Sequence, residues 1–186
     1  MPKRRIFIAL PLKKEFSSAL AEHLKSFLDL SIRFIPFQNW HLTLIFLGYL
    51  TDKEIREAEK IIEEASAKFP GFSLKSKNIT LSPGIRPRML WLNFQDNKIY
   101  NGLTTWLEER INFLKKENKE IKIHLTLARF DQREGGKIQE KFEKLGLDKV
   151  SKFGKELLID KIQIMESRLK RDGAVYNLIR EYKLKL

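Results

Sequence analysis

The chain has 186 residues, of which 42% are hydrophobic and 11% aromatic, so it can fold around one sizeable core or two small lobes. Its 36 Lys and Arg residues outnumber 24 Asp and Glu residues, and the net charge of +12 favours RNA or a nucleotide as partner over a merely charged, soluble surface. The absence of cysteine excludes disulfides, thiolate metal sites and cysteine nucleophiles, and fits a reducing cytoplasm.

The N-terminal segment places basic residues before an apolar run, as a signal peptide does. The run is interrupted by Pro11 and by the charged residues from Lys13 to Glu15, so it is too short for a signal sequence. No window approaches the ~20 apolar residues of a membrane span. We therefore expect a soluble cytoplasmic protein that is monomeric and has no contact with a membrane.

The first elements are expected to be a strand, a helix and a second strand. Arg5 to Leu10 is an apolar run typical of a strand. Residues 12–30 are predicted to be helical, because their apolar residues recur at helical spacing: Phe16, Leu20, Leu24, Phe27 and Leu28. Residues 31–37 are expected to form a short strand.

The middle of the chain predicts a helix, a hairpin and another helix. Thr51 and Glu54 have the Thr-x-x-Glu spacing of a capping box. Phe72–Leu81 and Pro87–Phe94 are extended segments joined by a Pro-Gly turn, as in a hairpin. Asp96 is expected to cap the next helix, whose apolar stripe consists of Ile99, Leu103, Trp106, Leu107, Ile111 and Leu114.

The last third of the chain predicts one short helix and two strands. Gly135-Gly136 is expected to break the chain before a helix that stops at Gly146. Leu157–Glu166 and Val175–Tyr182 are strand-like, and the Asp172-Gly173 pair between them indicates a hairpin. Helices and hairpins are therefore interleaved, with antiparallel strand connections.

One tetrapeptide, His-Leu-Thr-Leu, occurs twice, in the apolar runs 40–48 and 123–130, and contains two of the three histidines. Since residues i and i+2 of a strand share a face, His41 lies beside Thr43 and His124 beside Thr126. The copies are 83 residues apart (124 minus 41), which suggests two similar halves. We expect an α+β fold of two lobes, whose antiparallel sheets face a central cleft with helices on the outside. A doubly wound α/β fold is the alternative, but it lacks its glycine-rich phosphate loop.

Two imidazoles and two hydroxyl groups could cleave a phosphodiester without a metal ion. One imidazole can protonate a leaving oxygen while the other deprotonates water, and hydroxyls can donate to the non-bridging phosphate oxygens. A single His-x-Thr in a strand usually has no role, whereas two identical copies make coincidence much less plausible. Two histidines could also bind zinc, but no Asp, Glu or Cys stands at ligand spacing beside them. The third histidine, His23, is interpreted as structural.

The chain resembles the 2H phosphoesterase superfamily and, within it, the LigT-like RNA 2′,3′-cyclic phosphodiesterases, also called 2′-5′ RNA ligases. The resemblance implies a single bilobal domain over residues 1–186, no metal or cofactor, and cleavage of an RNA 2′,3′-cyclic phosphate end to a 2′-phosphomonoester. It extends over most of the chain and rests on segments 5–10, 40–48, 87–92, 123–130 and 173–176.

The resemblance also implies a role for each motif residue. His41 would be the proton donor to the departing 3′ oxygen and His124 the base that activates water. Thr43 and Thr126 would contact the phosphate. Arg129 matches the family's arginine after the second motif, but its strand parity is opposite to that of His124, so it could reach the site only if the strand bends or ends there.

Two other functions and two minor assignments stay open. The same site could join tRNA halves as a reversible 2′-5′ RNA ligase, or the chain could be a non-catalytic RNA-binding module. Trp40 and Phe130 could stack on a nucleobase, although packing in the core is favoured. The lysine-rich segment from Lys115 to Lys122 could guide an RNA backbone or form a solvated turn.

Overall fold

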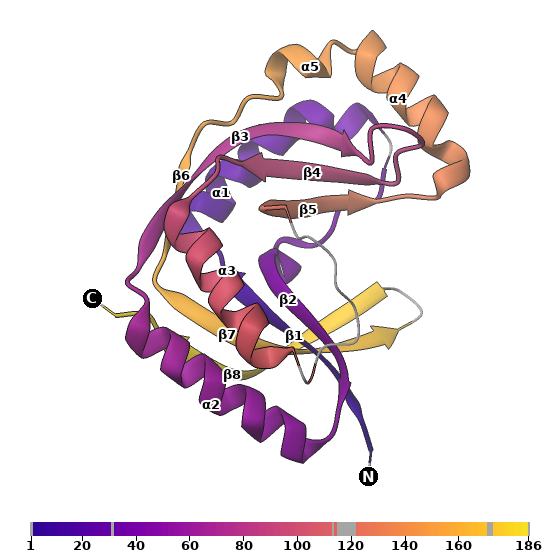
Figure 1. Ribbon diagram of the computed structural model, residues 1–186. Coiled ribbons are helices and arrows are strands. Elements are labelled where there is room, and N and C mark those ends of the chain that lie inside the picture. Colours follow the sequence, from indigo (N-terminus) through magenta and orange to yellow (C-terminus); the bar gives the residue numbers. More distant parts are fainter. Residues whose placement is uncertain (1, 31, 113, 115–121, 171–172, 186) are drawn as a thin grey trace.

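Eight antiparallel strands form one curled sheet in the order β6-β3-β4-β5-β2-β1-β7-β8 (Figure 1). The computed structural model describes residues 2–30, 32–112, 114, 122–170 and 173–185. The strands are β1 (Arg4–Pro11), β2 (His41–Leu50), β3 (Phe72–Ser82), β4 (Met89–Phe94), β5 (His124–Arg129), β6 (Glu156–Ile159), β7 (Lys161–Lys170) and β8 (Gly173–Lys183). The helices are α1 (Lys14–His23), α2 (Asp52–Lys68), α3 (Lys98–Ile111), α4 (Gly135–Lys144) and α5 (Leu147–Val150), with 3-10 turns η1 (Leu24–Leu30), η2 (Phe37–Asn39) and η3 (Gln132–Glu134).

The sheet consists of two four-stranded halves, β6-β3-β4-β5 and β2-β1-β7-β8. They meet where β2 and β5 pair antiparallel at Leu42 and Leu125. The two strands that carry the repeated tetrapeptide are therefore the two central strands, and the strand order is symmetrical about them. The prediction of an antiparallel, two-lobed α+β fold is confirmed, and its two facing sheets are the halves of one continuous sheet.

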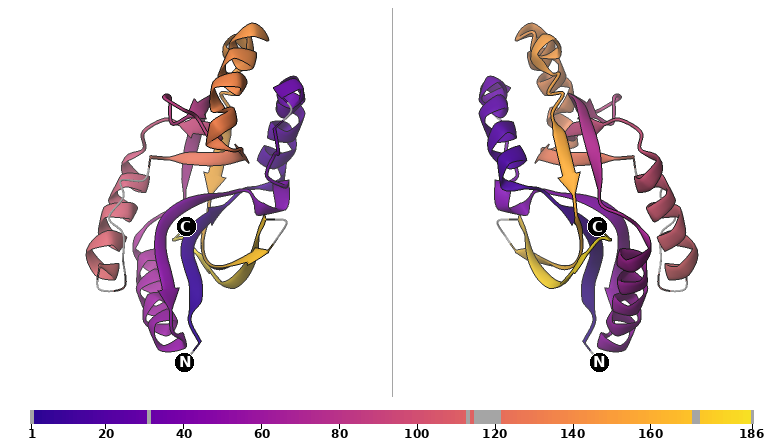
Figure 2. Two further views of the ribbon diagram at one scale, coloured as in Figure 1. Left: turned by 90° about the vertical axis from the view of Figure 1, so that its right-hand side faces the viewer. Right: turned by 90° about the vertical axis from the view of Figure 1, so that its left-hand side faces the viewer.

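The helices cover the halves of the sheet in two groups. Helices α2 and α3 pack against each other and against β2, and α2 also contacts β7 and β8. Helix α1 reaches the other half, where Phe16 stacks on Phe94 of β4 at 6.1 Å between ring centroids. Figure 2 shows α1 and α3 on opposite flanks of the molecule. Within the described segments, no helix combines the length and apolar composition needed to cross a membrane.

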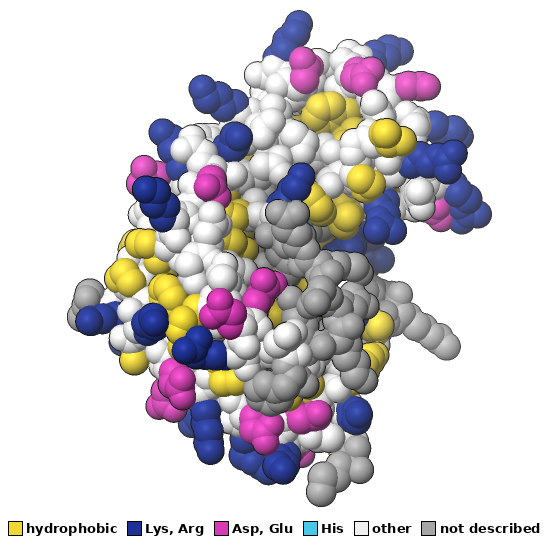
Figure 3. Space-filling view, viewed as in Figure 1, with side chains coloured by type: hydrophobic (Ala, Val, Ile, Leu, Met, Phe, Trp, Pro, Cys, Tyr) yellow, Lys and Arg dark blue, Asp and Glu magenta, His cyan; other side chains and the backbone are white. Residues whose placement is uncertain are grey.

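Strand β1 is buried on both faces. Ile6, Ile8 and Leu10 lie on one face, and Phe7 and Ala9 lie on the opposite, concave face of the curled sheet, where they are 2% and 0% exposed. Basic side chains are spread over the molecular surface and are frequent near the β3–β4 connection and the start of α4 (Figure 3).

Both central strands contain a β-bulge at the same distance from their histidine. The register of β2 against β1 shifts between Ile8 and Ala9, and Leu44 and Ile45 are both buried. The register of β5 against β4 shifts in the same way, and Leu127 and Ala128 are both buried. A bulge inserts one extra residue and reverses the parity of everything after it. The repeat seen in sequence thus extends to the backbone.

Two local predictions are wrong in detail. Asn97, not Asp96, caps α3: the Asn97 side chain accepts a hydrogen bond from Tyr100 N at 3.0 Å, while Asp96 accepts one from the Asn101 side chain. Asn and Asp are equally good caps, so neighbouring candidates cannot be separated by residue type. The strand predicted here is not formed by residues 32–37, in which Phe34 makes a single isolated β-bridge to Ala128.

Two further boundaries differ from the prediction in the last third of the chain. Leu157–Glu166 is not one strand: it is divided at Asp160 into β6, which pairs with β3, and β7, which pairs with β1. Apolar alternation continues through both strands, so it does not reveal that the chain crosses between the halves. Gly135-Gly136 does not break the chain but forms the first turn of α4. The β7–β8 hairpin is confirmed, with Lys170 paired to Gly173, and Asp172 lies outside the described residues.

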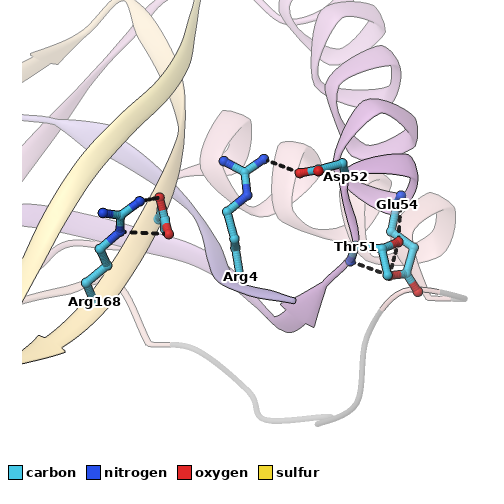
Figure 4. A network of polar contacts seen from close by, with 6 residues as sticks. Arg4, Thr51, Asp52, Glu54 and Arg168 are labelled. Atoms are coloured by element: carbon cyan, nitrogen blue, oxygen red, sulfur yellow. Dashed lines mark hydrogen bonds and ion pairs between the residues drawn. The ribbon is translucent and has the colours of Figure 1, made fainter. Parts of the chain in front are cut away.

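The predicted capping box at the start of α2 is present (Figure 4). The Glu54 carboxylate accepts hydrogen bonds from Thr51 N at 2.6 Å and from Thr51 Oγ1 at 2.7 Å, and Asp52 in the same turn pairs with Arg4 at 2.8 Å.

We expect Thr51→Ala to lower the free energy of unfolding by about 1 kcal/mol, measured by urea denaturation. Thr105→Ala, at an exposed position inside α3, is the control and should cause no loss, because alanine is the better helix former. Equal losses in both variants would contradict a capping role.

Candidate active site

The four predicted residues of the repeated motif come together at the junction of the two sheet halves. His41 and Thr43 flank Leu42 at the start of β2, and His124 and Thr126 flank its partner Leu125 in β5. Continuing the antiparallel register from this pair sets His41 across from Thr126 and Thr43 across from His124. All four are half-buried, while the two leucines behind them are 1% exposed.

Both histidines are held by the same backbone hydrogen bond. His41 Nδ1 lies 2.8 Å from the carbonyl of Asn39, and His124 Nδ1 lies 2.7 Å from the carbonyl of Lys122. A carbonyl oxygen only accepts, so each Nδ1 carries the hydrogen and donates it. In the neutral ring, Nε2 is then left with a free lone pair, and in the protonated ring Nε2 can donate. Each strand thus supplies one Nε2 that is able to take or give a proton.

Aromatic rings support each imidazole, and sequence reasoning assigned them no role. The His41 ring lies 4.8 Å from Phe7 and 4.9 Å, edge to face, from Tyr176. The His124 ring stacks on Trp91 at 3.8 Å and 23°. Trp91 and Tyr176 belong to segments on which the family resemblance rests, and this was the only signal in the sequence that could have marked them. These contacts restrict the orientation of both imidazoles.

Arg129 lies on the same face as His124, because the bulge at Leu127 and Ala128 provides the bend that its parity required. Its side chain is exposed and donates a weak hydrogen bond to the thioether of Met89 at 3.5 Å. Its positive charge lowers the pKa of both histidines. The equivalent position of the other half, five residues after His41, holds the uncharged Phe46. The site is therefore symmetrical in its imidazoles and hydroxyls but not in its cation.

Burial is the largest cause that lowers the pKa of His41 below its ordinary value, and the positive charges of Arg129 and His124 lower it further. Burial and Arg129 likewise lower the pKa of His124. In each ring the Nδ1 hydrogen bond acts in the opposite direction. Both rings therefore favour the neutral form in the free protein, and a bound anion between them would favour protonation.

This direction of the shifts predicts how catalysis depends on pH. The profile of kcat/KM reports the free protein, in which both histidine pKa values are lowered, so we expect its optimum below about pH 6.5. The profile of kcat reports the complex with an anionic phosphodiester, which raises both values. We expect the kcat optimum at higher pH than the kcat/KM optimum. Initial rates measured across pH test this order, and the reverse order would contradict the electrostatic account.

The remaining sequence predictions fall outside the site. Trp40 is 8% exposed and donates to the carbonyl of Ile35 at 2.9 Å, which confirms that it packs in the core. Phe130 packs against the core as a partly buried residue. His23 contacts the rings of Phe27 and Phe153, as expected of a structural histidine. Lys122 is exposed and contributes its carbonyl to His124, and Lys115–Lys119 lie outside the described residues.

The part of the chain that the structure describes contains no group of three or more His, Cys, Asp or Glu residues that could hold a metal ion. The chemistry that the site itself offers is proton transfer by two imidazoles, with hydroxyl groups and one guanidinium available to an anion.

A fold of this topology with two histidine-threonine pairs at its centre defines a phosphoesterase of the LigT-like class, and residues 8–91 match the family model described as LigT like Phosphoesterase. An RNA 2′,3′-cyclic phosphodiesterase of Aquifex aeolicus is 30% identical over 189 residues, covering 97% of each chain. The chain belongs to the LigT-like RNA 2′,3′-cyclic phosphodiesterase family. A Methanocaldococcus jannaschii protein with the same name is 24% identical and is covered to 99%.

The fold is shared with solved structures. E. coli LigT complexed with 3′-AMP superposes with a TM-score of 0.76 at 19% identity, over 99% of each chain. The structure of TT0787 from Thermus thermophilus superposes with a TM-score of 0.75 at 22% identity, over 97% of each chain. At these identities the likeness establishes the architecture, and residue roles must come from the site itself.

Proposed function

We propose that the protein hydrolyses RNA 2′,3′-cyclic phosphodiester ends to 2′-phosphomonoesters by acid–base catalysis with His41 and His124. One observation carries the proposal: two identical His-x-Thr strands meet at Leu42 and Leu125, and each holds its histidine by Nδ1 so that Nε2 is free. The names of the Aquifex and Methanocaldococcus relatives support the same activity.

In the proposed reaction, the cyclic phosphate lies between the two imidazoles. His124 Nε2 takes a proton from a water molecule, whose oxygen forms a bond to phosphorus. The bond from phosphorus to the 3′ oxygen breaks, and His41 Nε2 gives its proton to that oxygen. The product carries a 2′-phosphate and a free 3′ hydroxyl, and the two histidines exchange protonation states before the next turnover.

Thr43, Thr126 and Arg129 are proposed to bind the non-bridging oxygens of the phosphate. Negative charge on these oxygens increases as water attacks, so fixed hydroxyl and guanidinium donors stabilise the transition state more than the ground state. The β-branched threonines are suited to this because their side chains have few rotamers on a strand. Arg129 can also offer two parallel N–H donors to one phosphate.

The proposal includes the setting of the reaction. Residues 1–186 would act as one bilobal domain, as a monomer in the cytoplasm, without a metal or cofactor, on RNA or a nucleotide. Solved structures of E. coli LigT with 3′-AMP and with NADP+ support a nucleotide as ligand.

The test is incubation of the protein with an oligonucleotide that ends in a 2′,3′-cyclic phosphate, in the presence of EDTA. We expect a 2′-phosphate product, identified by ³¹P NMR and by its difference from a synthetic 3′-phosphate standard. Loss of activity in EDTA that a divalent ion restores would replace the scheme with metal-assisted hydrolysis. A 3′-phosphate product would mean that the other P–O bond breaks.

The same reaction mixture separates the two alternatives that the sequence left open. Adding an RNA with a 5′ hydroxyl group offers an incoming nucleophile in place of water, so a 2′-5′ linked product would identify ligase activity. Binding of RNA without any turnover would identify a non-catalytic module. We expect hydrolysis to dominate both with and without the added RNA.

A further inference from the structure

We infer that the connection between β3 and β4 is a binding surface for the phosphate backbone of single-stranded RNA, 5′ to the reacting end, and that Arg86 and Arg88 are its contact residues. The inference rests on the proposed function and adds to it a preference for RNA chains over single nucleotides.

The connection lies next to the cation of the active site. Met89, the first residue of β4, pairs with Arg129 at the end of β5. Arg88 immediately precedes it, and its carbonyl accepts a hydrogen bond from Phe130 N at 3.0 Å. Arg86 precedes Arg88 by two residues, so it lies farther from β4 along the chain. Arg86 and Arg88 therefore lie in the segment that leads into the strand neighbour of Arg129.

The backbone of this connection is held in place. Arg88 N donates to the carbonyl of Ser82 at 3.0 Å, which closes the turn. Pro87 is buried against the start of α4, where a Cβ added to Gly135 would lie 2.3 Å from the Pro87 carbonyl oxygen. Only glycine permits this approach. The arginines are thus presented from a fixed support, which lowers the entropy cost of binding an anion.

Arg86 and Arg88 are both exposed, and no acidic residue in the described ranges forms an ion pair with either. The neighbouring Arg133 differs, because Asp131 binds it at 2.6 Å. Arg86 also has a φ of 53°, the one positive φ among the described non-glycine residues. This conformation is strained for a residue with a side chain, so the loop keeps an arginine where glycine would be less strained.

The position of Arg129 carries no charge in the other half of the sheet. Where the second half has Arg129, the first has Phe46, which is 48% exposed and uncharged. Figure 3 shows basic side chains gathered near the β3–β4 connection. A terminal cyclic phosphate satisfies only the active site, whereas each preceding nucleotide adds one negative charge that a guanidinium can bind.

The test compares two substrates with the same reactive end: adenosine 2′,3′-cyclic phosphate and a short oligoadenylate ending in that group. For the variant Arg86→Gln/Arg88→Gln, we expect kcat/KM to fall about tenfold on the oligonucleotide, and its dependence on log salt to weaken by roughly 0.7 for each lost phosphate contact. On the mononucleotide, kcat/KM should be unchanged. The control variant Arg56→Gln/Lys60→Gln removes the same charge from exposed positions of α2 and should affect neither substrate.

Equal losses on both substrates, or an equal loss in the control variant, would overturn the inference. Failure of the proposed function is distinguishable, because the wild-type protein would then turn over neither substrate. In that case, the affinity for an oligoadenylate ending in a 2′-phosphate is measured by fluorescence anisotropy. Weaker and less salt-dependent binding in the arginine variant alone would support RNA binding by the β3–β4 connection. Unchanged binding would refute it.

Discussion

Replacing His41 or His124 with alanine is expected to lower kcat/KM for RNA 2′,3′-cyclic phosphate ends by ~10²-fold or more, because each removes one of the two proton-transfer groups. Each histidine is held by an Nδ1 hydrogen bond and has a free Nε2. Because one must give a proton while the other takes one, a single histidine cannot perform both tasks at the same time. The double variant should be slower than either single variant, because each single variant keeps one proton-transfer group.

The two single variants should also differ in how their residual activity depends on pH. Without the acid His41, the fall in rate at high pH should disappear; without the base His124, the fall at low pH should disappear. His23→Ala is the control, since that ring packs against Phe27 and Phe153 and should keep its activity wherever the protein remains folded. Full activity in either active-site variant would remove that residue from the mechanism.

Arg129→Gln is expected to reduce kcat/KM by about 10- to 100-fold, the loss of a charged hydrogen bond worth roughly 1.5–3 kcal/mol. It should also raise the pKa of both histidines, because the charge of Arg129 lowers both in the native protein. The kcat/KM profile should therefore move to higher pH. A residue with only a structural role would reduce activity without this displacement.

Arg133→Gln is the matched control for Arg129. Arg133 is an exposed arginine four residues away, bound to Asp131 by hydrogen bonds of 2.6 and 3.1 Å, and no histidine pKa depends on it. Its replacement should leave both the rate on a mononucleotide and the pH profile unchanged. If the two variants behave alike, Arg129 has no special relation to the phosphate.

Much of the fold could be predicted because its information is local. An apolar run located β1, and extended segments on either side of a Pro-Gly turn located β3 and β4. Helical spacing located α1 to α3, and the Thr51–Glu54 pair identified the start of α2. The predictions that failed also depended on local patterns, but these patterns fit more than one structure. Asp96 and Asn97 are both good caps, and β6 and β7 share one alternation pattern although they belong to different halves.

The site was predictable in its paired residues and not in their surroundings. The repeated tetrapeptide indicated His41 and His124 because equal spacing on strands gives equal geometry. The bulge that brings Arg129 to the same face was not visible, since two successive apolar residues also occur in a regular strand that is buried on both faces. Trp91 and Tyr176 come from β4 and β8, so their contacts with the imidazoles depend on strand order, which alternation does not encode.

The most direct measurement of the central claim is an NMR titration of the two imidazoles with adenosine 2′-monophosphate, the mononucleotide form of the expected product. One phosphate between two rings predicts that the ring signals of His41 and His124 shift together, with one stoichiometry and one Kd, and that both pKa values rise. Shifts in only one of the two rings, or two different dissociation constants, would show that the histidines do not act on a single phosphorus atom.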